Sequence, residues 1–145
     1  MDHEQIVNEL IELFRENEIE AARGRGDIPS MVIFPDALGV NADRTVIMNI
    51  SPVFNDEESI VFELFTLIVK GVFPEDMGEF FAQLNQLNVD TTCGTYIYLK
   101  EKGFIAHRLT VCSVLNGYMQ SIPLAVDNVL NTINEDLQIL EEMII

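Results

Sequence analysis

The chain has 145 residues, 24 of them acidic and 8 basic, which gives a formal net charge of −16 at pH 7. This length suggests one domain over 1–145, and a hydrophobic share of 48% is that of a globular protein with a real core. The acidic excess repels phosphate backbones and anionic lipid surfaces, so we expect neither nucleic acid nor a membrane as a partner. A basic protein would be attracted, although a solvated coat that keeps the protein soluble explains the charge as well.

The N-terminus is polar and acidic, without the apolar segment of a signal peptide, and no apolar run reaches the roughly 18 residues of a membrane span. Two cysteines, Cys93 and Cys112, in a chain without a secretion signal indicate reduced thiols. We therefore expect a cytoplasmic protein.

The first predicted element is a helix over residues 3–22. Asp2 and Gln5 have the spacing of a capping box, and Gly24 and Gly26 follow the helix as terminators. Its apolar stripe has helical spacing and consists of Ile6, Val7, Leu10, Leu13 and Phe14.

Three strands are predicted next, over 31–34, 45–50 and 60–70, with 51–58 as the connection between the last two. The strand 60–70 is apolar on both faces. One face holds Ile60, Phe62, Leu64 and Ile68, and the other holds Val61, Phe65, Leu67 and Val69. Such a strand is usually central in its sheet, or has its second face covered by something else.

Residues 74–112 predict an amphipathic helix followed by a hairpin. Pro74 suits the first helical position, and the apolar stripe consists of Met77, Phe80, Phe81, Leu84 and Leu87.

A three-residue loop that ends at Gly103 pairs Lys100 with Phe104, Tyr98 with Ala106 and Ile97 with His107. This register places Tyr96 and Tyr98 on the face opposite His107. It also turns Cys93, expected to be buried, away from Cys112, so we predict no disulfide between them.

A final helix is predicted over 121–144, with Ser121 as its N-cap and Pro123 early in the helix. The element order is then α-β-β-β-α-β-β-α. It predicts an α+β fold in which helices pack on a five-stranded antiparallel sheet.

The sequence offers little support for catalysis, a metal or a cofactor, and we predict none. His3, His107, Cys93 and Cys112 lack the spacing of a metal site, and the chain contains no CxxC or HExxH motif. His107 lies on an apolar strand face, where a core histidine with one satisfied nitrogen is the favoured interpretation. A Cys93–His107 dyad is conceivable, but buried cysteines are usually inert.

Apolar residues that do not all fit the predicted stripes are a better indication of function. Together with the doubly apolar strand 60–70 they suggest a surface covered by another protein chain. The predicted protein-binding residues are Phe65, Tyr96, Tyr98, Phe104, Tyr118 and Met119.

The element order, the acidic charge and the segments EFFAQLNQLN and GTYIYLKEKGFIAHRL resemble the YbjN family. That family is described as bacterial sensory-transduction regulators with the fold of type III secretion chaperones. The resemblance implies an α+β sandwich that binds other proteins, often as a dimer, and has no enzymatic activity. Chaperones of this shape hold an unfolded segment of their client.

The leading hypothesis is therefore a non-enzymatic, chaperone-like or regulatory protein-binding module that forms a homodimer, with a basic or partly unfolded partner. The alternative is a small-ligand or metal-binding enzyme centred on His107 and Cys93, which needs a deep polar pocket beside them. A third hypothesis is an acidic mimic of nucleic acid, which needs its acids in a stripe on one face.

Overall fold

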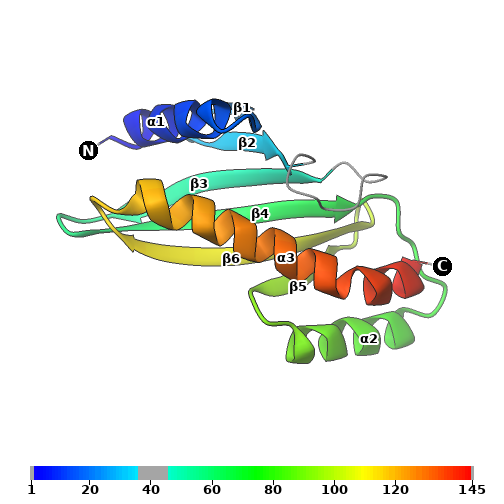
Figure 1. The fold of residues 1–145 in the computed structure, drawn as a ribbon. Coiled ribbons are helices and arrows are strands. Elements are labelled where there is room, and N and C mark those ends of the chain that lie inside the picture. The colour runs from blue at the N-terminus through cyan, green and yellow to red at the C-terminus, as the bar shows by residue number, and fades with distance from the viewer. Residues whose placement is uncertain (1, 36–45, 145) are drawn as a thin grey trace.

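The computed structural model describes residues 2–35 and 46–144, and within them it has three helices and one six-stranded antiparallel sheet (Figure 1). The elements in chain order are α1 (His3–Glu16), β1 (Glu20–Arg23), β2 (Met31–Phe34), β3 (Ile47–Asn55), β4 (Ser59–Val69), α2 (Met77–Asp90), β5 (Thr95–Leu99), β6 (Phe104–Val114) and α3 (Tyr118–Ile144). The strand order in the sheet is β1-β2-β3-β4-β6-β5. The predicted α+β class is confirmed, and the predicted five strands are wrong by one.

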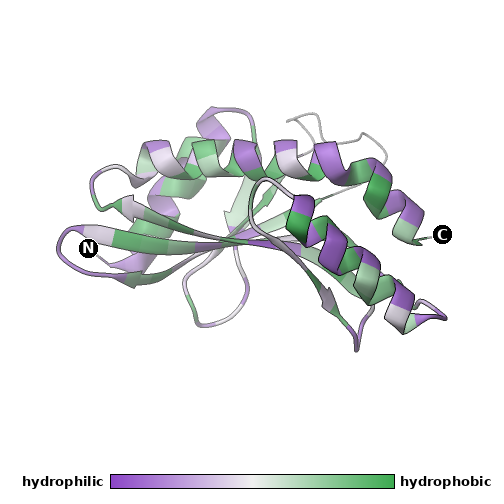
Figure 2. Cartoon of the chain, turned by 90° about the horizontal axis from the view of Figure 1, so that it is seen from below, coloured by the Kyte–Doolittle hydropathy of each residue, from purple (hydrophilic) through white to green (hydrophobic). Residues whose placement is uncertain are grey.

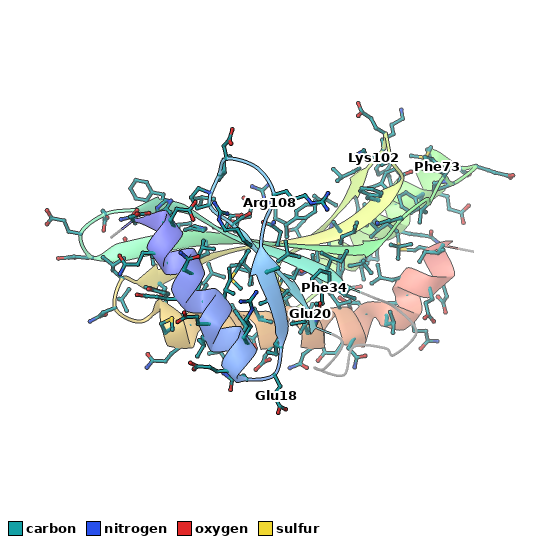
Figure 3. All side chains as sticks on the ribbon, turned by 90° about the horizontal axis from the view of Figure 1, so that it is seen from above. Glu18, Glu20, Phe34, Phe73, Lys102 and Arg108 are labelled. Atoms are coloured by element: carbon teal, nitrogen blue, oxygen red, sulfur yellow. The ribbon has the colours of Figure 1, made fainter. Side chains whose placement is uncertain are left out.

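The helices cover one face of the sheet, which we call the covered face. α3 runs along this side, and α1 lies on the same side at β1 (Figures 1 and 2). The other face, called the open face, has no helix on it among the described elements. In Figure 3, Arg108 lies on the side of the sheet opposite α3, and Phe34 and Glu20 lie on the side of β1 and β2 away from α1.

The hydrophobic core lies between the covered face and the helices. Alternate residues of β4 are buried there, because successive side chains of a strand point to opposite faces. The strand residues of the core include Met31, Ile33, Met48, Ile50, Ile60, Phe62, Leu64 and Ile105. The buried face of α1 consists of Ile6, Val7, Leu10, Ile11 and Phe14, close to its predicted stripe.

The predicted helix over 3–22 is wrong beyond residue 16. Glu18 has a φ of 63°, and the chain closes α1 through bonds from Glu18 N–H to the Arg15 carbonyl and from Ile19 N–H to the Phe14 carbonyl. This is the Schellman arrangement, which usually has glycine in the left-handed position. Because glutamate stands where a helix-ending glycine is usual, the sequence does not show where α1 ends. The predicted helix therefore ran on through the residues that form β1.

The segment 51–58 is only partly a connection. β3 continues to Asn55, with a register shift between Pro52 and Phe54. Pro52 favours a break in a sequence-based prediction because it donates no ladder bond, yet a bulge accommodates it. The start of the predicted strand at Thr45 lies outside the described residues.

The two later helices start differently from their predictions. α2 begins at Met77, where the Asp76 carboxylate accepts a hydrogen bond from Glu79 N–H at 3.0 Å, so Pro74 precedes the helix. α3 begins at Tyr118, three residues before Ser121, and contains Pro123 within it. Ser121 Oγ donates to the Gly117 carbonyl and is not an N-cap.

The predicted hairpin register is wrong by one residue. Leu99 pairs with Phe104, Tyr98 with Ile105 and Tyr96 with His107, so the turn has one residue more than predicted. Gly103 has a φ of 65°, and its carbonyl accepts from Val72 N–H at 2.9 Å. Because directly paired residues share a face, this register places Tyr96 and Tyr98 on the covered face with His107.

The β5 edge of the sheet is capped by a side chain. Asn88 of α2 donates to the Tyr96 carbonyl at 2.9 Å, and Tyr96 N–H donates to Asn88 Oδ1 at 2.6 Å. The amide thus bonds both backbone groups, as a neighbouring strand would. At the β1 edge, Arg15 Nε donates to the Ala21 carbonyl at 2.9 Å. The backbone groups of Tyr96 and the carbonyl of Ala21 are therefore not free to pair with an added strand, for which an edge strand is otherwise a template.

Candidate functional site

The open face carries a continuous apolar strip in the middle of the sheet. Ile47, Leu67, Ala106 and Ile97 lie opposite one another across β3, β4, β6 and β5. In the next row, Phe65 of β4 lies between Asn49 and Arg108. Leu67, Ile97 and Phe65 are half-buried and Ala106 is buried. The prediction that β4 is an interior strand with two apolar faces is confirmed.

The strand residues of the open face include few charged side chains. The strand pairing assigns three charged side chains to the open face within the described strands. They are Glu20 on β1, Glu63 on β4 and Arg108 on β6. Arg108 and Glu63 form an ion pair at 3.3 Å. This face is therefore close to neutral, whereas the whole chain has a formal charge of −16.

The six predicted protein-binding residues do not form one surface. Phe65 and Phe104 lie on the open face and are half-buried. Tyr98 and Met119 are half-buried against the core. The expectation that Tyr96 and Tyr118 are surface residues is wrong, because their exposed fractions are 1% and 3%.

The tertiary structure explains why the last two tyrosines are inside. The corrected hairpin register turns Tyr96 toward α3, and the extra turn at the start of α3 places the Tyr118 ring beside Phe62, with ring centroids 6.1 Å apart. The Tyr118 hydroxyl donates to the Glu9 carboxylate of α1. Burial raises the pKa of Tyr118, and the bond to Glu9 adds to the rise.

His107 is fully buried on the covered face, as predicted for a core histidine with one satisfied nitrogen. Its Nε2 lies 2.6 Å from the carbonyl oxygen of Cys93. A carbonyl only accepts hydrogen bonds, so Nε2 carries the hydrogen in the neutral ring. Nδ1 has no hydrogen-bond partner among the described residues, and the same holds for the hydroxyl of Thr66, which lies opposite His107 on β4.

A polar cluster joins the end of α2, the start of β5 and α3. The Asp136 carboxylate accepts hydrogen bonds from the Tyr96 hydroxyl at 2.7 Å and from Thr91 Oγ1 at 2.9 Å. Burial raises the pKa of Tyr96 well above its usual range, and the bond to Asp136 raises it further. The ring of Tyr96 meets that of His107 edge-on, with centroids 5.0 Å apart. The cluster therefore holds elements together and leaves Tyr96 protonated.

The two cysteines are free thiols. Cys112 is exposed on the open face, opposite Val61. Cys93 precedes β5 and is half-buried against the core, so it is less buried than expected. Partial burial raises the pKa of the Cys93 thiol, which favours the less reactive protonated form.

Within residues 2–35 and 46–144, no group of three or more His, Cys, Asp or Glu side chains is placed to hold a metal ion. In the same part of the chain, no helix combines the length and apolarity that crossing a membrane requires.

Replacing His107 with Gln is expected to lower the free energy of unfolding by about 1–3 kcal/mol, because a buried hydrogen bond is lost or weakened. The loss should depend on pH. Burial lowers the pKa of His107 in the folded protein, whereas a histidine in the unfolded chain has a pKa of about 6.5. The unfolded chain thus binds more protons below about pH 6.5, so this group's contribution to stability falls as the pH drops from there toward the lowered pKa.

Urea unfolding of both proteins at several pH values between neutral and mildly acidic measures this effect. We expect the wild-type protein to lose more stability on acidification than the Gln variant, which has no ring to protonate. If the stability of the two proteins changed with pH in parallel, His107 would not be the cause of the loss of stability on acidification.

No protein-family model matches this chain, and no curated protein matches it in sequence. The resemblance to the YbjN family therefore stays a prediction.

Sequence reasoning overlooked part of the open-face strip. Leu67 and Phe65 stand out in the sequence because strand 60–70 is apolar on both faces. Ile97 and Ala106 carry no such signal. They join the strip only because the hairpin register turns them to the side of Leu67.

Proposed function

We propose that this protein is a non-enzymatic protein-binding module, chaperone-like or regulatory, that acts as a homodimer through the open face. The observation that carries the proposal is the strip of Ile47, Leu67, Ala106 and Ile97, which continues across the interior of the sheet with no helix on it among the described elements. Removing apolar surface of this kind from water favours association by roughly 25 cal/mol per Å².

The distribution of charge supports a second copy of the chain as the occupant. Two chains of formal charge −16 repel each other over most of their surfaces. The open face has two acidic and one basic strand side chains, and Arg108 is already paired with Glu63. When two open faces meet, few charges of like sign come close to each other, so electrostatic repulsion between the two chains is small there.

The alternative, an enzyme or small-ligand protein centred on His107 and Cys93, has less support. His107 is 0% exposed, and its Nε2 is engaged by a backbone carbonyl. The contact is made by the backbone carbonyl of Cys93 and not by its thiol. This hydrogen bond therefore does not join the thiol, as nucleophile, to the imidazole, as base.

The third hypothesis, a mimic of nucleic acid, needs acids along one face. The acids of α1 and of the loops do not continue across the described strands of the open face. The chaperone-like fold implied by the YbjN resemblance agrees better with protein binding through the sheet.

Light scattering tests the homodimer. We expect the wild-type protein at micromolar concentration to have about twice the chain mass of 16.4 kDa, because a specific dimer of about 1,200–2,000 Å² total area is then stable. Leu67→Glu and, separately, Ile97→Glu should give the monomer mass, since each places a charge in the apolar strip.

Val89→Glu is the matched control, because Val89 is 77% exposed on α2 and lies away from the strip. It adds the same charge and should leave the dimer intact. Circular dichroism establishes that each variant is folded. A wild-type monomer, or a dimer that both strip variants retain, would rule out the open face as the interface.

A further inference from the structure

A groove lies at the end of the molecule where the C-terminus of α3 comes beside the start of α2 (Figure 1). Its third wall is the segment 70–76, which joins β4 to α2. The groove has a volume of about 700 Å³. This volume is within the range of clefts that bind ligands in proteins.

The floor of the groove is apolar and fixed. Val72, Phe80 and Met143 line it and are 6%, 2% and 7% exposed. The Val72 backbone is held on both sides, because its N–H donates to the Gly103 carbonyl and its carbonyl accepts from the Tyr98 hydroxyl at 2.5 Å. At the rim, Phe73 is 66% exposed and lies beside the hairpin turn that carries Lys102 (Figure 3).

The rim is strongly acidic. Glu75, Asp76, Glu79 and Glu142 line the groove, against Lys70 as its basic residue. The Asp76 carboxylate is used as the cap of α2. The carboxylates of Glu75, Glu79 and Glu142 have no hydrogen-bond or ion-pair partner within the described residues. Three uncommitted negative charges thus surround an apolar floor.

We propose that this groove binds a short segment of a partner protein that carries Lys or Arg next to an apolar side chain. The apolar side chain would lie on the floor of Phe80 and Met143 and stack against Phe73, and the cationic groups would meet the rim carboxylates. This inference rests on the proposed protein-binding function, but it concerns a surface on the helix side of the sheet, separate from the open face. Electrostatic complementarity of this kind also steers a basic segment to its site.

The probe is a fluorescein-labelled dodecapeptide with the central sequence Arg-Phe-Arg in a Gly-Ser background, compared with a peptide that has Glu-Phe-Glu. Fluorescence anisotropy measures the dissociation constant with the full chain. We expect the Arg peptide to bind at least about tenfold more tightly than the Glu peptide, and its binding to weaken at high salt.

A matched pair of charge-neutralising variants separates the groove from the general acidity of the chain. Glu79→Gln with Glu142→Gln should weaken binding of the Arg peptide by about tenfold or more. Glu57→Gln with Glu58→Gln removes the same charge at the exposed β3–β4 turn and should change binding by less than about twofold. Phe73→Ser should weaken binding through lost apolar contact.

Chemical-shift changes in the wild-type protein locate the peptide. They should be largest at the amides of 70–80 and 140–144. Equal losses in the two Glu-to-Gln pairs, or shifts spread over the whole acidic surface, would overturn the proposal.

The mass of the wild-type protein and its peptide binding, measured together, separate this inference from the homodimer. If the wild-type protein is monomeric and still binds the peptide in the groove, the homodimer fails and the groove stands. If the wild-type protein dimerises through the open face and no peptide binds, the groove fails and the proposed interface stands.

Discussion

Gly94→Ala is expected to lower the free energy of unfolding by about 3–5 kcal/mol. Gly94 has a φ of +73°, where a residue with a side chain is strained. A Cβ atom built there would lie 2.4 Å from His107 Cε1 and 2.7 Å from the Arg108 carbonyl oxygen. His107 is buried between strands, so neither atom has room to move away. Denaturant unfolding monitored by circular dichroism measures the loss.

Gly71→Ala is the matched control for this prediction. Gly71 has nearly the same φ, +71°, but a Cβ there meets nothing within 4 Å. The control variant should lose about 1–2 kcal/mol from backbone strain alone. The difference between the two variants then reports the contact with His107. Equal losses would mean that the ring yields easily and that the core around His107 is less tightly packed than described.

Asp136→Ala is expected to lower the free energy of unfolding by about 2–4 kcal/mol. The carboxylate accepts from two hydroxyl groups, those of Tyr96 and Thr91. Its removal leaves the Tyr96 hydroxyl without its acceptor in a side chain that is only 1% exposed. An unsatisfied buried hydroxyl costs more than the net value of the bond it made. The cluster joins α2, β5 and α3, so all three elements should loosen together.

A double-mutant cycle with Tyr96→Phe tests the assignment. In the Phe background there is no hydroxyl to strand, so Asp136→Ala should cost less than it does in the wild-type protein. Asp127→Ala is the control on the same helix, because Asp127 is exposed and the change should alter stability by less than about 0.5 kcal/mol. Additive effects of Asp136→Ala and Tyr96→Phe would indicate that the two side chains are not coupled.

Periodicity predicted the parts of the fold that depend on one segment at a time. The stripe of Ile6, Val7, Leu10 and Phe14 is the buried face of α1, and the doubly apolar run 60–70 is an interior strand. The burial of His107, with one nitrogen bonded, also followed from its place in an apolar row. Each of these depends on which residues a regular helix or strand turns to one side.

The elements that were predicted wrongly depend on contacts between segments. Glu18 closes α1 in a conformation that usually calls for glycine, so β1 had no marker in the sequence. In the observed hairpin, the Gly103 carbonyl at the turn accepts a hydrogen bond from Val72, which lies about 30 residues earlier in the chain. One residue of slip moved Tyr96 from a predicted surface into the core and turned Tyr98, which is half-buried, toward it.

For the candidate sites, the sequence by itself determined the acidic charge, the absence of familiar catalytic motifs and the surplus of apolar residues on strand 60–70. Only the tertiary structure decided where that surplus lies. Side-chain periodicity in a strand is two, so one face of β4 had to be covered and the other had to face away from the helices. Which residues of other strands join Leu67 is a matter of register across the sheet. Which acidic residues surround Phe80 depends on how the end of α3 packs beside α2. The spacing of residues within one segment predicts neither the register across the sheet nor this packing.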